Sequence, residues 1–137
     1  MLSSTSEYAL KAVLYLAEHD GGTPVRVGQM SEALRIPRNY LAKILHELAR
    51  SGVLVSARGK HGGFRLGRRA AEISLLAIVG RFDRLEARRA CLLGRRSCSD
   101  RHPCPAHSRW KALSEQTAAF FRDTTVADLL EGAELVA

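Results

Sequence analysis

The sequence predicts a mainly α-helical fold with one small β-hairpin, and three observations support this. Apolar residues recur every three or four positions, the helical spacing, along several stretches of the 137-residue chain. One segment, residues 53–66, is instead rich in strand-forming residues around a glycine-rich turn. Glycine and proline separate these stretches, so that each is expected to form an element of its own.

The first predicted helix covers residues 4–19. Tyr8, Ala12 and Leu16 repeat every four residues, which places them on one helical face. Ser4 and Glu7 have the spacing of a capping box, in which both side chains accept hydrogen bonds from backbone N–H groups of the first turn. Residues 20–24 contain two glycines and a proline, which end the helix.

Two helices joined by a tight turn are predicted next, at about residues 27–34 and 38–51. Pro37 suits the start of the second helix because its φ is already helical, and Gly52 suits its end. The apolar positions of this second helix are Leu41, Ile44, Leu45 and Leu48. The pattern is typical of a helix-turn-helix, whose second helix enters the major groove of DNA.

The strand-forming segment follows this pair of helices directly. Residues 53–57 and 64–66 are predicted to pair as strands, and residues 58–63 (Arg-Gly-Lys-His-Gly-Gly) to form the turn between them. A helix-turn-helix followed by such a basic hairpin makes a winged helix. The fold class is therefore a winged helix-turn-helix with further helices after it.

Three helices are predicted after the hairpin, at residues 73–82 with Ser74 as the cap, at residues 106–121, and at residues 126–130. The long helix carries one apolar and aromatic stripe: Trp110, Leu113, Thr117, Phe120 and Phe121. Such a stripe needs a partner surface. We expect a second copy of the chain, with the chain's own first helix as the alternative or additional partner.

Positive charge is concentrated in one third of the chain. Its net charge is +7, and residues 26–70 hold ten Lys or Arg against two Asp or Glu. A basic segment of this kind is an electrostatic footprint for a polyanion such as DNA. The chain contains no apolar run of the ~20 residues that cross a bilayer and no secretory signal pattern, so we expect a cytoplasmic protein. It shows no paired-carboxylate, Ser–His–Asp or nucleotide-loop pattern, so we expect no enzyme.

Candidate DNA contacts lie in two places. The polar residues that open the second helix face away from its apolar stripe, where base edges and phosphates would lie. The wing tip has basic residues among glycines that permit a close backbone approach. These candidates are Arg38, Asn39, Tyr40 and Lys43 in the helix, and Arg58, Lys60 and His61 in the wing. Arg26 and Arg65 are expected to be phosphate clamps or plain surface charges.

The three cysteines of the chain, Cys91, Cys98 and Cys104, lie within fourteen residues of one another. Clustered thiols on a loop indicate a bound metal or a redox switch. An iron–sulfur cluster needs four ligands, and His107, three residues after the last cysteine, could be the fourth. Zinc held by the same four residues, or two cysteines oxidised to a disulfide, are the alternatives.

The chain resembles the Rrf-type (IscR/NsrR-like) family of bacterial winged-helix regulators over nearly its whole length. The resemblance rests on residues 6–10 (SEYAL), 36–41 (IPRNYL), 51–59 with Gly62-Gly63-Phe64, and the cysteine loop that ends in Cys-Pro-Ala-His at residues 104–107. It implies a homodimer on a roughly palindromic operator in double-stranded DNA, with the long C-terminal helices crossing at the interface.

In several members of that family three loop cysteines hold a [2Fe–2S] or [4Fe–4S] cluster. The resemblance also offers Glu7 as a fourth ligand, donated across the dimer, beside His107. This chain has six residues between Cys91 and Cys98, one more than the cluster-binding members, which leaves the cluster type open.

The resulting hypothesis divides the chain into a DNA-binding winged helix-turn-helix (1–83), a cysteine-bearing sensor loop (84–107), and a dimerisation helix with a tail (108–137). Its function would be that of a transcriptional regulator which senses redox state, nitric oxide or iron–sulfur status through a cluster. A cluster-free thiol-redox or ligand-responsive repressor is one alternative, and a zinc-binding protein-interaction module is the other.

Overall fold

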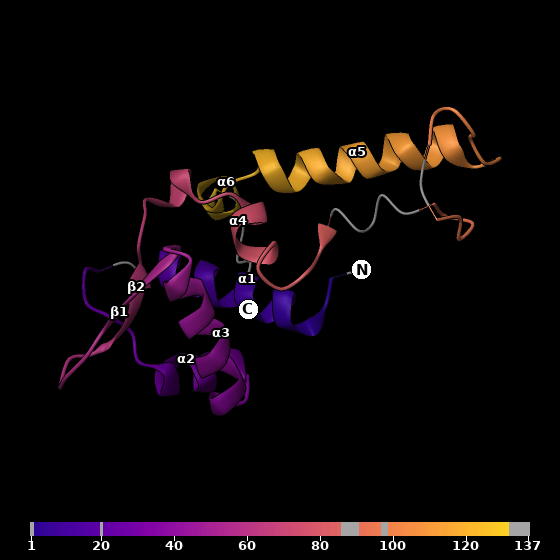
Figure 1. The fold of residues 1–137 in the computed structure, drawn as a ribbon. Coiled ribbons are helices and arrows are strands. Elements are labelled where there is room, and N and C mark those ends of the chain that lie inside the picture. The colour runs from indigo at the N-terminus through magenta and orange to yellow at the C-terminus, as the bar shows by residue number, and fades with distance from the viewer. Residues whose placement is uncertain (1, 20, 86–90, 97–98, 132–137) are drawn as a thin grey trace.

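The computed structural model describes residues 2–19, 21–85, 91–96 and 99–131. The elements follow one another along the chain as α1 (Ser4–Glu18), α2 (Val27–Leu34), α3 (Arg38–Arg50), β1 (Leu54–Ala57), β2 (Gly63–Leu66), the 3-10 helix η1 (Ala70–Glu72), α4 (Leu75–Val79), α5 (His107–Asp123) and α6 (Val126–Leu130). The predicted fold class is confirmed: the protein is mainly α-helical with one antiparallel hairpin (Figure 1).

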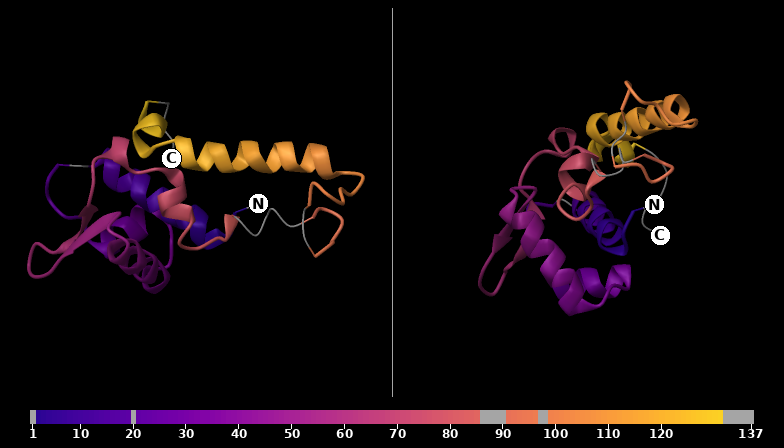
Figure 2. Two further views of the ribbon diagram at one scale, coloured as in Figure 1. Left: turned by 45° about the horizontal axis from the view of Figure 1, so that its top comes forward. Right: turned by 45° about the vertical axis from the view of Figure 1, so that its right-hand side comes forward.

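The helices stack in layers, with α1 at the centre. α2 and α3 lie on one side of α1, and α4 and then α5 lie on the other (Figures 1 and 2). The hairpin of β1 and β2 projects at one end of the molecule, and the cysteine-bearing segment lies at the opposite end, beside the start of α5. The wing candidates and the cysteine-bearing segment therefore lie at opposite ends of the molecule.

One apolar core fills the space between α1, α2, α3 and the hairpin. Its fully enclosed members include Val13, Met30, Leu41, Leu45 and Leu48. Val126 of α6 belongs to the same core, so the end of the chain folds back onto the first helices. A smaller cluster of Leu75, Val79 and Phe121 joins α4 to α5.

The start of α1 differs from the prediction. Ser3 is the N-cap, and its Oγ accepts a hydrogen bond from the backbone N–H of Ser6. The expected capping box of Ser4 and Glu7 was wrong, because the helix begins one residue earlier than that pairing requires. Ser3 is fixed at this position by a tertiary contact, since its backbone N–H and its Oγ both donate to Asp83.

The turn between α2 and α3 gives the helix-turn-helix its shape. Arg35 adopts a left-handed conformation with φ of 55°, and the Oγ of Ser31 donates to the carbonyl of Ile36 at 2.6 Å. Pro37 is the N-cap of α3, immediately before the first helical residue. Gly52, with φ of 87°, takes the left-handed position after the helix, which confirms it as the stop.

The wing is a short hairpin that a third segment holds in place. Leu54 pairs with Leu66, and Ala57 with Gly63, at its two ends. Val25 forms a further antiparallel bridge to Phe64, with both N–H···O bonds at 2.8 Å. The approach is so close that a Cβ on Gly63 would lie 2.4 Å from the carbonyl oxygen of Val25. Only glycine fits there, and it also supplies the φ of 147° that the turn requires.

The helix predicted at 73–82 is shorter, Leu75–Val79, although Ser74 caps it as expected. The residue before the cap is extended rather than helical. The carbonyl of Ile73 accepts from the N–H of Val126, and Ser74 bridges to Thr125. A long-range pairing with the segment before α6 therefore removes the first predicted turn. The last turn is absent because Gly80 ends the helix.

Candidate functional site

The outer face of α3 carries the predicted DNA-contacting residues. Arg38, Asn39 and Lys43 are exposed, whereas Leu41 and Ile44 of the same helix are buried in the core. The helix thus presents two amine or guanidinium groups and one amide to solvent from its first turns. These groups can donate to phosphates and to base edges.

Tyr40 lies differently from its neighbours. Its hydroxyl is hydrogen-bonded to the hydroxyl of Thr5, and its ring meets that of Tyr8 edge-on, with 5.6 Å between the centroids. The side chain is 38% exposed. Tyr40 therefore joins the start of α3 to the start of α1, a role that the helical pattern of α3 alone did not indicate.

The wing presents Arg58, Lys60 and His61, all exposed at its tip. Arg26 precedes α2, and its guanidinium donates to the carbonyl oxygen of Lys60. Arg26 therefore braces the tip of the hairpin, a function that was not foreseen for it. At the base of the wing, the ring of His46 from α3 contacts Phe64 edge-on at 5.3 Å. These contacts fix the wing relative to α2 and α3.

Two of the three cysteines are described, and both are buried. Cys91 and Cys104 are each 7% exposed, and the two side chains are hydrogen-bonded to each other. Backbone hydrogen bonds, that from Arg95 first and that from Leu93 after it, hold the pKa of Cys91 below its usual value. Thiolate is the form that binds metals and reacts with oxidants. Cys98 lies outside the described residues.

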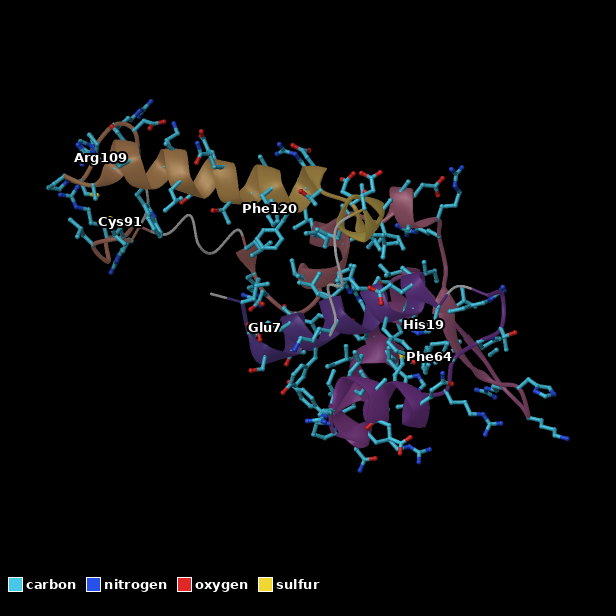
Figure 3. The ribbon with its side chains drawn as sticks, turned by 180° about the vertical axis from the view of Figure 1, so that it is seen from behind. Glu7, His19, Phe64, Cys91, Arg109 and Phe120 are labelled. Carbon is cyan, nitrogen blue, oxygen red and sulfur yellow. The ribbon has the colours of Figure 1, made fainter. Side chains whose placement is uncertain are left out.

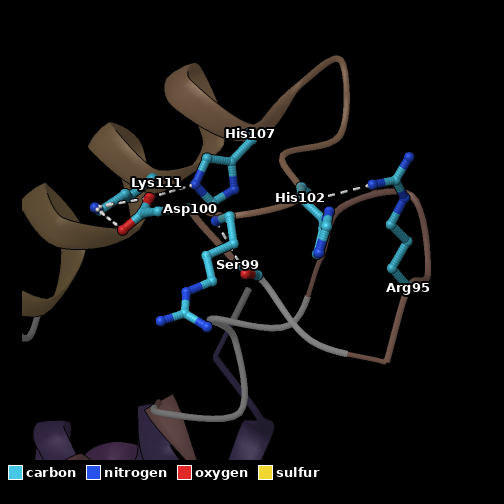
Figure 4. A network of polar contacts seen from close by, with 7 residues as sticks. Arg95, Ser99, Asp100, His102, His107 and Lys111 are labelled. Atoms are coloured by element: carbon cyan, nitrogen blue, oxygen red, sulfur yellow. Dashed lines mark hydrogen bonds and ion pairs between the residues drawn. The ribbon is translucent and has the colours of Figure 1, made fainter.

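His107 begins α5 and is buried among these groups. Its backbone N–H donates to the carbonyl of Cys104 at 3.0 Å, and its Nε2–H donates to Asp100 Oδ1 at 2.7 Å. The Nζ of Lys111 donates to both oxygens of the same carboxylate (Figure 4). These bonds, that of His107 first, hold the pKa of Asp100 below its usual value, so that it accepts them as a carboxylate.

Glu7 is exposed on α1, and Figure 3 shows it well apart from Cys91 of the same chain. Within one chain the structure therefore brings His107, but not Glu7, to the cysteine segment. Across the described residues no group of three or more His, Cys, Asp or Glu side chains is arranged to hold a metal ion. The chemistry of the described donors nevertheless fits a soft metal, since two adjacent buried sulfurs include one that favours the thiolate.

The predicted stripe on α5 divides into two parts. Phe121 is buried against α4, whereas Leu113 and Phe120 are 54% and 52% exposed. At the start of the helix, apolar side chains and one arginine line an open hollow of about 580 Å³: Leu92, Leu93, Pro105, Ala106, Arg109, Trp110 and Leu113. Within one chain, therefore, the apolar core covers the stripe at Phe121 and leaves Leu113 and Phe120 exposed.

Comparison with known proteins decides the family. The sequence profile of the Rrf2 family, described as iron-dependent transcriptional regulators, matches residues 2–132. The chain belongs to the Rrf2 family. Members of this family are DNA-binding transcriptional regulators and not enzymes, and the resemblance inferred from the motifs is confirmed.

Two relatives illustrate how far the similarity extends. An HTH-type protein of Aquifex aeolicus is 36% identical over 132 residues, covering 95% of this chain and 91% of the relative. The regulator IscR of Vibrio atlanticus is 31% identical over 135 residues, covering 98% of this chain and 78% of IscR. Both alignments run through the winged helix and the cysteine segment into α5.

Solved structures of the Rrf2 family show the same fold. CymR, the global cysteine regulator of Bacillus subtilis, superposes with a TM-score of 0.81 at 19% identity, covering 98% of each chain. IscR of T. potens superposes with a TM-score of 0.77 at 23% identity, covering 98% of this chain and 88% of IscR. No helix among the described residues is both long and apolar enough to span a membrane.

The sequence patterns missed three of the residues that shape this site: Thr5, Asp100 and Lys111. Each acts through polar side-chain contacts that follow no periodic pattern in the sequence: Thr5 with Tyr40, and Asp100 with His107 and Lys111. Of the three, Lys111 was the easiest to predict from the sequence, because it lies four residues after His107 and residues at that spacing share a helix face.

Proposed function

We propose that this Rrf2-family regulator works as a homodimer whose affinity for DNA is set by an iron–sulfur cluster on Cys91, Cys98 and Cys104. The single observation that carries the proposal is the adjacency of two buried sulfurs, Cys91 and Cys104, in an environment that favours the thiolate. The IscR relatives share 30–31% identity over this region and the rest of the chain.

The DNA-binding surface combines α3 and the wing. Arg38, Asn39 and Lys43 would enter the major groove, while Arg58, Lys60 and His61 would reach phosphates or the minor groove from the wing tip. Tyr40 contributes mainly by holding the start of α3, because its hydroxyl is bound to Thr5. Arg26 contributes by fixing the wing tip.

The dimer would form along α5. Leu113 and Phe120 leave more than half of their surface exposed, and a second copy of the helix could cover both. A twofold axis there would place two winged domains so that both recognition helices address one palindromic operator.

The fourth cluster ligand would be His107 or Glu7. His107 is the nearer group within one chain, three residues beyond Cys104 and hydrogen-bonded to its carbonyl through the backbone. Glu7 is exposed and does not cap its own helix, so it is available to the cysteine segment of a second copy.

When bound, such a cluster supplies a centre that reacts with oxidants or nitric oxide. The role of the chain in this proposal is to move α5 when the cysteine sulfurs are displaced. Cys104 sits at the turn into α5, with its carbonyl bonded to His107, so a displacement of this sulfur acts directly on the first turn of the helix. A helix that forms the dimer interface then changes the spacing of the two winged domains.

Iron and acid-labile sulfide, measured in protein purified without oxygen, test the cluster. We expect both in the wild type and neither in Cys104→Ala, while Ser108→Ala, an exposed neighbour on α5, keeps both. Wild-type protein that holds neither element after reconstitution would remove the cluster from the proposal. Zinc in place of iron would favour a structural metal.

Duplex binding measured at several salt concentrations tests the DNA surface. Each neutralised phosphate lowers the logarithm of the binding constant by ~0.9 per tenfold rise in salt. We expect Lys60→Ala to reduce this slope by about that amount, and Arg122→Gln, on α5, to leave it unchanged. A slope that Lys60→Ala does not alter would argue against wing contact with phosphates.

Sizing of the dilute protein, with light scattering, tests the dimer. Leu113→Glu with Phe120→Glu should yield monomers, because each places a charge at the proposed interface. Val55, which is 40% exposed on the wing strand β1, is the control: Val55→Glu should leave the dimer intact. A monomeric wild type would contradict the assembly.

A thiol switch without a cluster is the second candidate, and the contact between Cys91 and Cys104 favours it as well. Hydrogen peroxide would accept two electrons and two protons from the two thiols, so that one disulfide and two water molecules form. One solved relative of this fold is described as the oxidised form of Staphylococcus aureus CymR. Peptide mass spectrometry after peroxide treatment would detect the Cys91–Cys104 link, which the cluster-based proposal does not require.

A further inference from the structure

Asp100 connects the cysteine segment to α5 through two side chains on one face of the helix. Its carboxylate accepts from His107 Nε2 at 2.7 Å and from Lys111 Nζ at 3.0 and 3.1 Å (Figure 4). His107 and Lys111 are four residues apart, so both reach the carboxylate from adjacent turns. The side chain of His107 is 8% exposed, whereas that of Asp100 is 70% exposed, so the contact joins a buried ring to a carboxylate that is open to solvent.

Asp100 itself lies in the short run of chain between Cys98 and Cys104. Two hydrogen bonds hold the residues around Asp100. The N–H of Arg101 donates to Ser99 Oγ at 3.1 Å, and Arg95 Nη1 donates to the carbonyl of His102 at 3.0 Å. The second bond spans seven residues of the segment. Arg95 thus joins the described residues 91–96 to residues 99–104, and Asp100 attaches the latter to α5.

Ion pairs between exposed side chains usually contribute little to stability, because both groups are already well solvated. This contact differs in that one partner is a buried imidazole, which loses its solvent on one side and gains a charged acceptor there. A ring held in this way has one orientation. Histidines that bind metals are commonly oriented by a carboxylate on the second ring nitrogen.

We propose that Asp100 is a positioning residue of the cysteine segment: it fixes the orientation of the His107 ring and anchors the run between Cys98 and Cys104 to the first turns of α5. Its relevance to sensing rests on the proposed function, whereas the anchoring does not. Through this contact a change at the sulfurs has a second route to α5, beside the backbone bond from His107 to Cys104.

Asp100→Asn is the decisive variant, because it keeps the size of the side chain and removes its charge. Asp100→Glu keeps the charge and is the rescue variant. Asp123→Asn is the matched control, since Asp123 is similarly exposed and pairs with Arg122 at the other end of α5 at 3.0 Å. All four proteins are first examined free of metal under reducing conditions.

Two measurements on the metal-free proteins decide the proposal. The first is amide hydrogen exchange at Trp110 and Lys111, in the first turns of α5, which we expect to be about five-fold faster in Asp100→Asn and unchanged in Asp123→Asn. The second is the pair of ring nitrogen chemical shifts of His107, which should move in Asp100→Asn and return toward the wild type in Asp100→Glu. A general loss of rigidity would not give that rescue. Unchanged exchange together with unchanged ring shifts would overturn the proposal.

A third measurement relates the anchor to the cluster. After anaerobic reconstitution, the visible absorbance should decay several-fold faster with a chelator in Asp100→Asn than in the wild type or Asp123→Asn. Equal decay in all three would show that Asp100 does not position the sensing site, and would overturn that part. A wild type without absorbance would refute the proposed cluster and leave the exchange and chemical-shift results to decide the anchor.

Discussion

Different kinds of contact stabilise the winged helix-turn-helix and the cysteine segment. Residues of α1, α2, α3 and the wing share one apolar core with fully enclosed leucines and valines. The described part of the cysteine segment is held by the polar bonds of Asp100 and Arg95 and by the contact of two buried sulfurs. Apolar burial is non-directional and shared among many side chains, whereas a few polar bonds depend on the geometry of each group. The first region is therefore held by many apolar contacts, and the described part of the second by a few specific bonds that single substitutions can remove.

The largest effect is expected in the core. Leu45→Ala should lower the free energy of unfolding by about 2–5 kcal/mol, because it removes a fully buried side chain and leaves a cavity. Leu93→Ala, at a residue that is 59% exposed in the cysteine segment, should change it by no more than about 0.5 kcal/mol. Chemical denaturation measures both. Equal losses would contradict the contrast between the two regions.

A glycine substitution in the wing tests the backbone geometry of the winged helix-turn-helix. Gly63→Ala should cost about 1–3 kcal/mol, because the φ of 147° is strained for alanine and the new Cβ collides with the Val25 carbonyl. We expect the Val25–Phe64 bridge to open, with faster hydrogen exchange at both amides. Gly21→Ala, where the added Cβ meets nothing within 4 Å, is the control and should have little effect.

A smaller effect is expected where α1 meets the recognition helix. Tyr40→Phe removes the hydroxyl that binds Thr5 and should lower the free energy of unfolding by about 1 kcal/mol. Thr5→Val removes the other partner. The double variant should cost less than the sum of the two single changes if the hydroxyls interact, and strict additivity would count against that interaction.

The smallest effect concerns an exposed ion pair of the DNA-binding part. Arg81 donates to Glu47 at 2.7 Å, and this bond holds the pKa of the carboxyl below its usual value of 4.5. The pair therefore adds stability above that value and loses it as the pH falls through the lower pKa of the folded state. The difference in stability between the wild type and Glu47→Gln should be small at pH 7 and vanish in acid. A difference that grows as the pH falls would contradict the assignment.

The sequence alone determined the local elements of this protein. The spacing of Leu41, Ile44, Leu45 and Leu48 predicted α3 and its buried face, and the glycines around residues 59–63 predicted the turn of the wing. These are local properties, because helical periodicity and the conformational freedom of glycine do not depend on distant residues. The proximity of the three cysteines in the sequence likewise indicated a common site, although it could not show which groups surround them.

Only the tertiary structure decided how these elements act on one another. Asp83 places the cap of α1 at Ser3, and the pairing of residues 73–74 with 125–126 shortens α4. The hydroxyl of Tyr40 binds Thr5 of α1, and Asp100 binds across to α5. Each of these contacts joins side chains or backbone groups that follow no common period in the sequence. Their formation depends on where the packed core holds the two segments, which no local pattern of residues records.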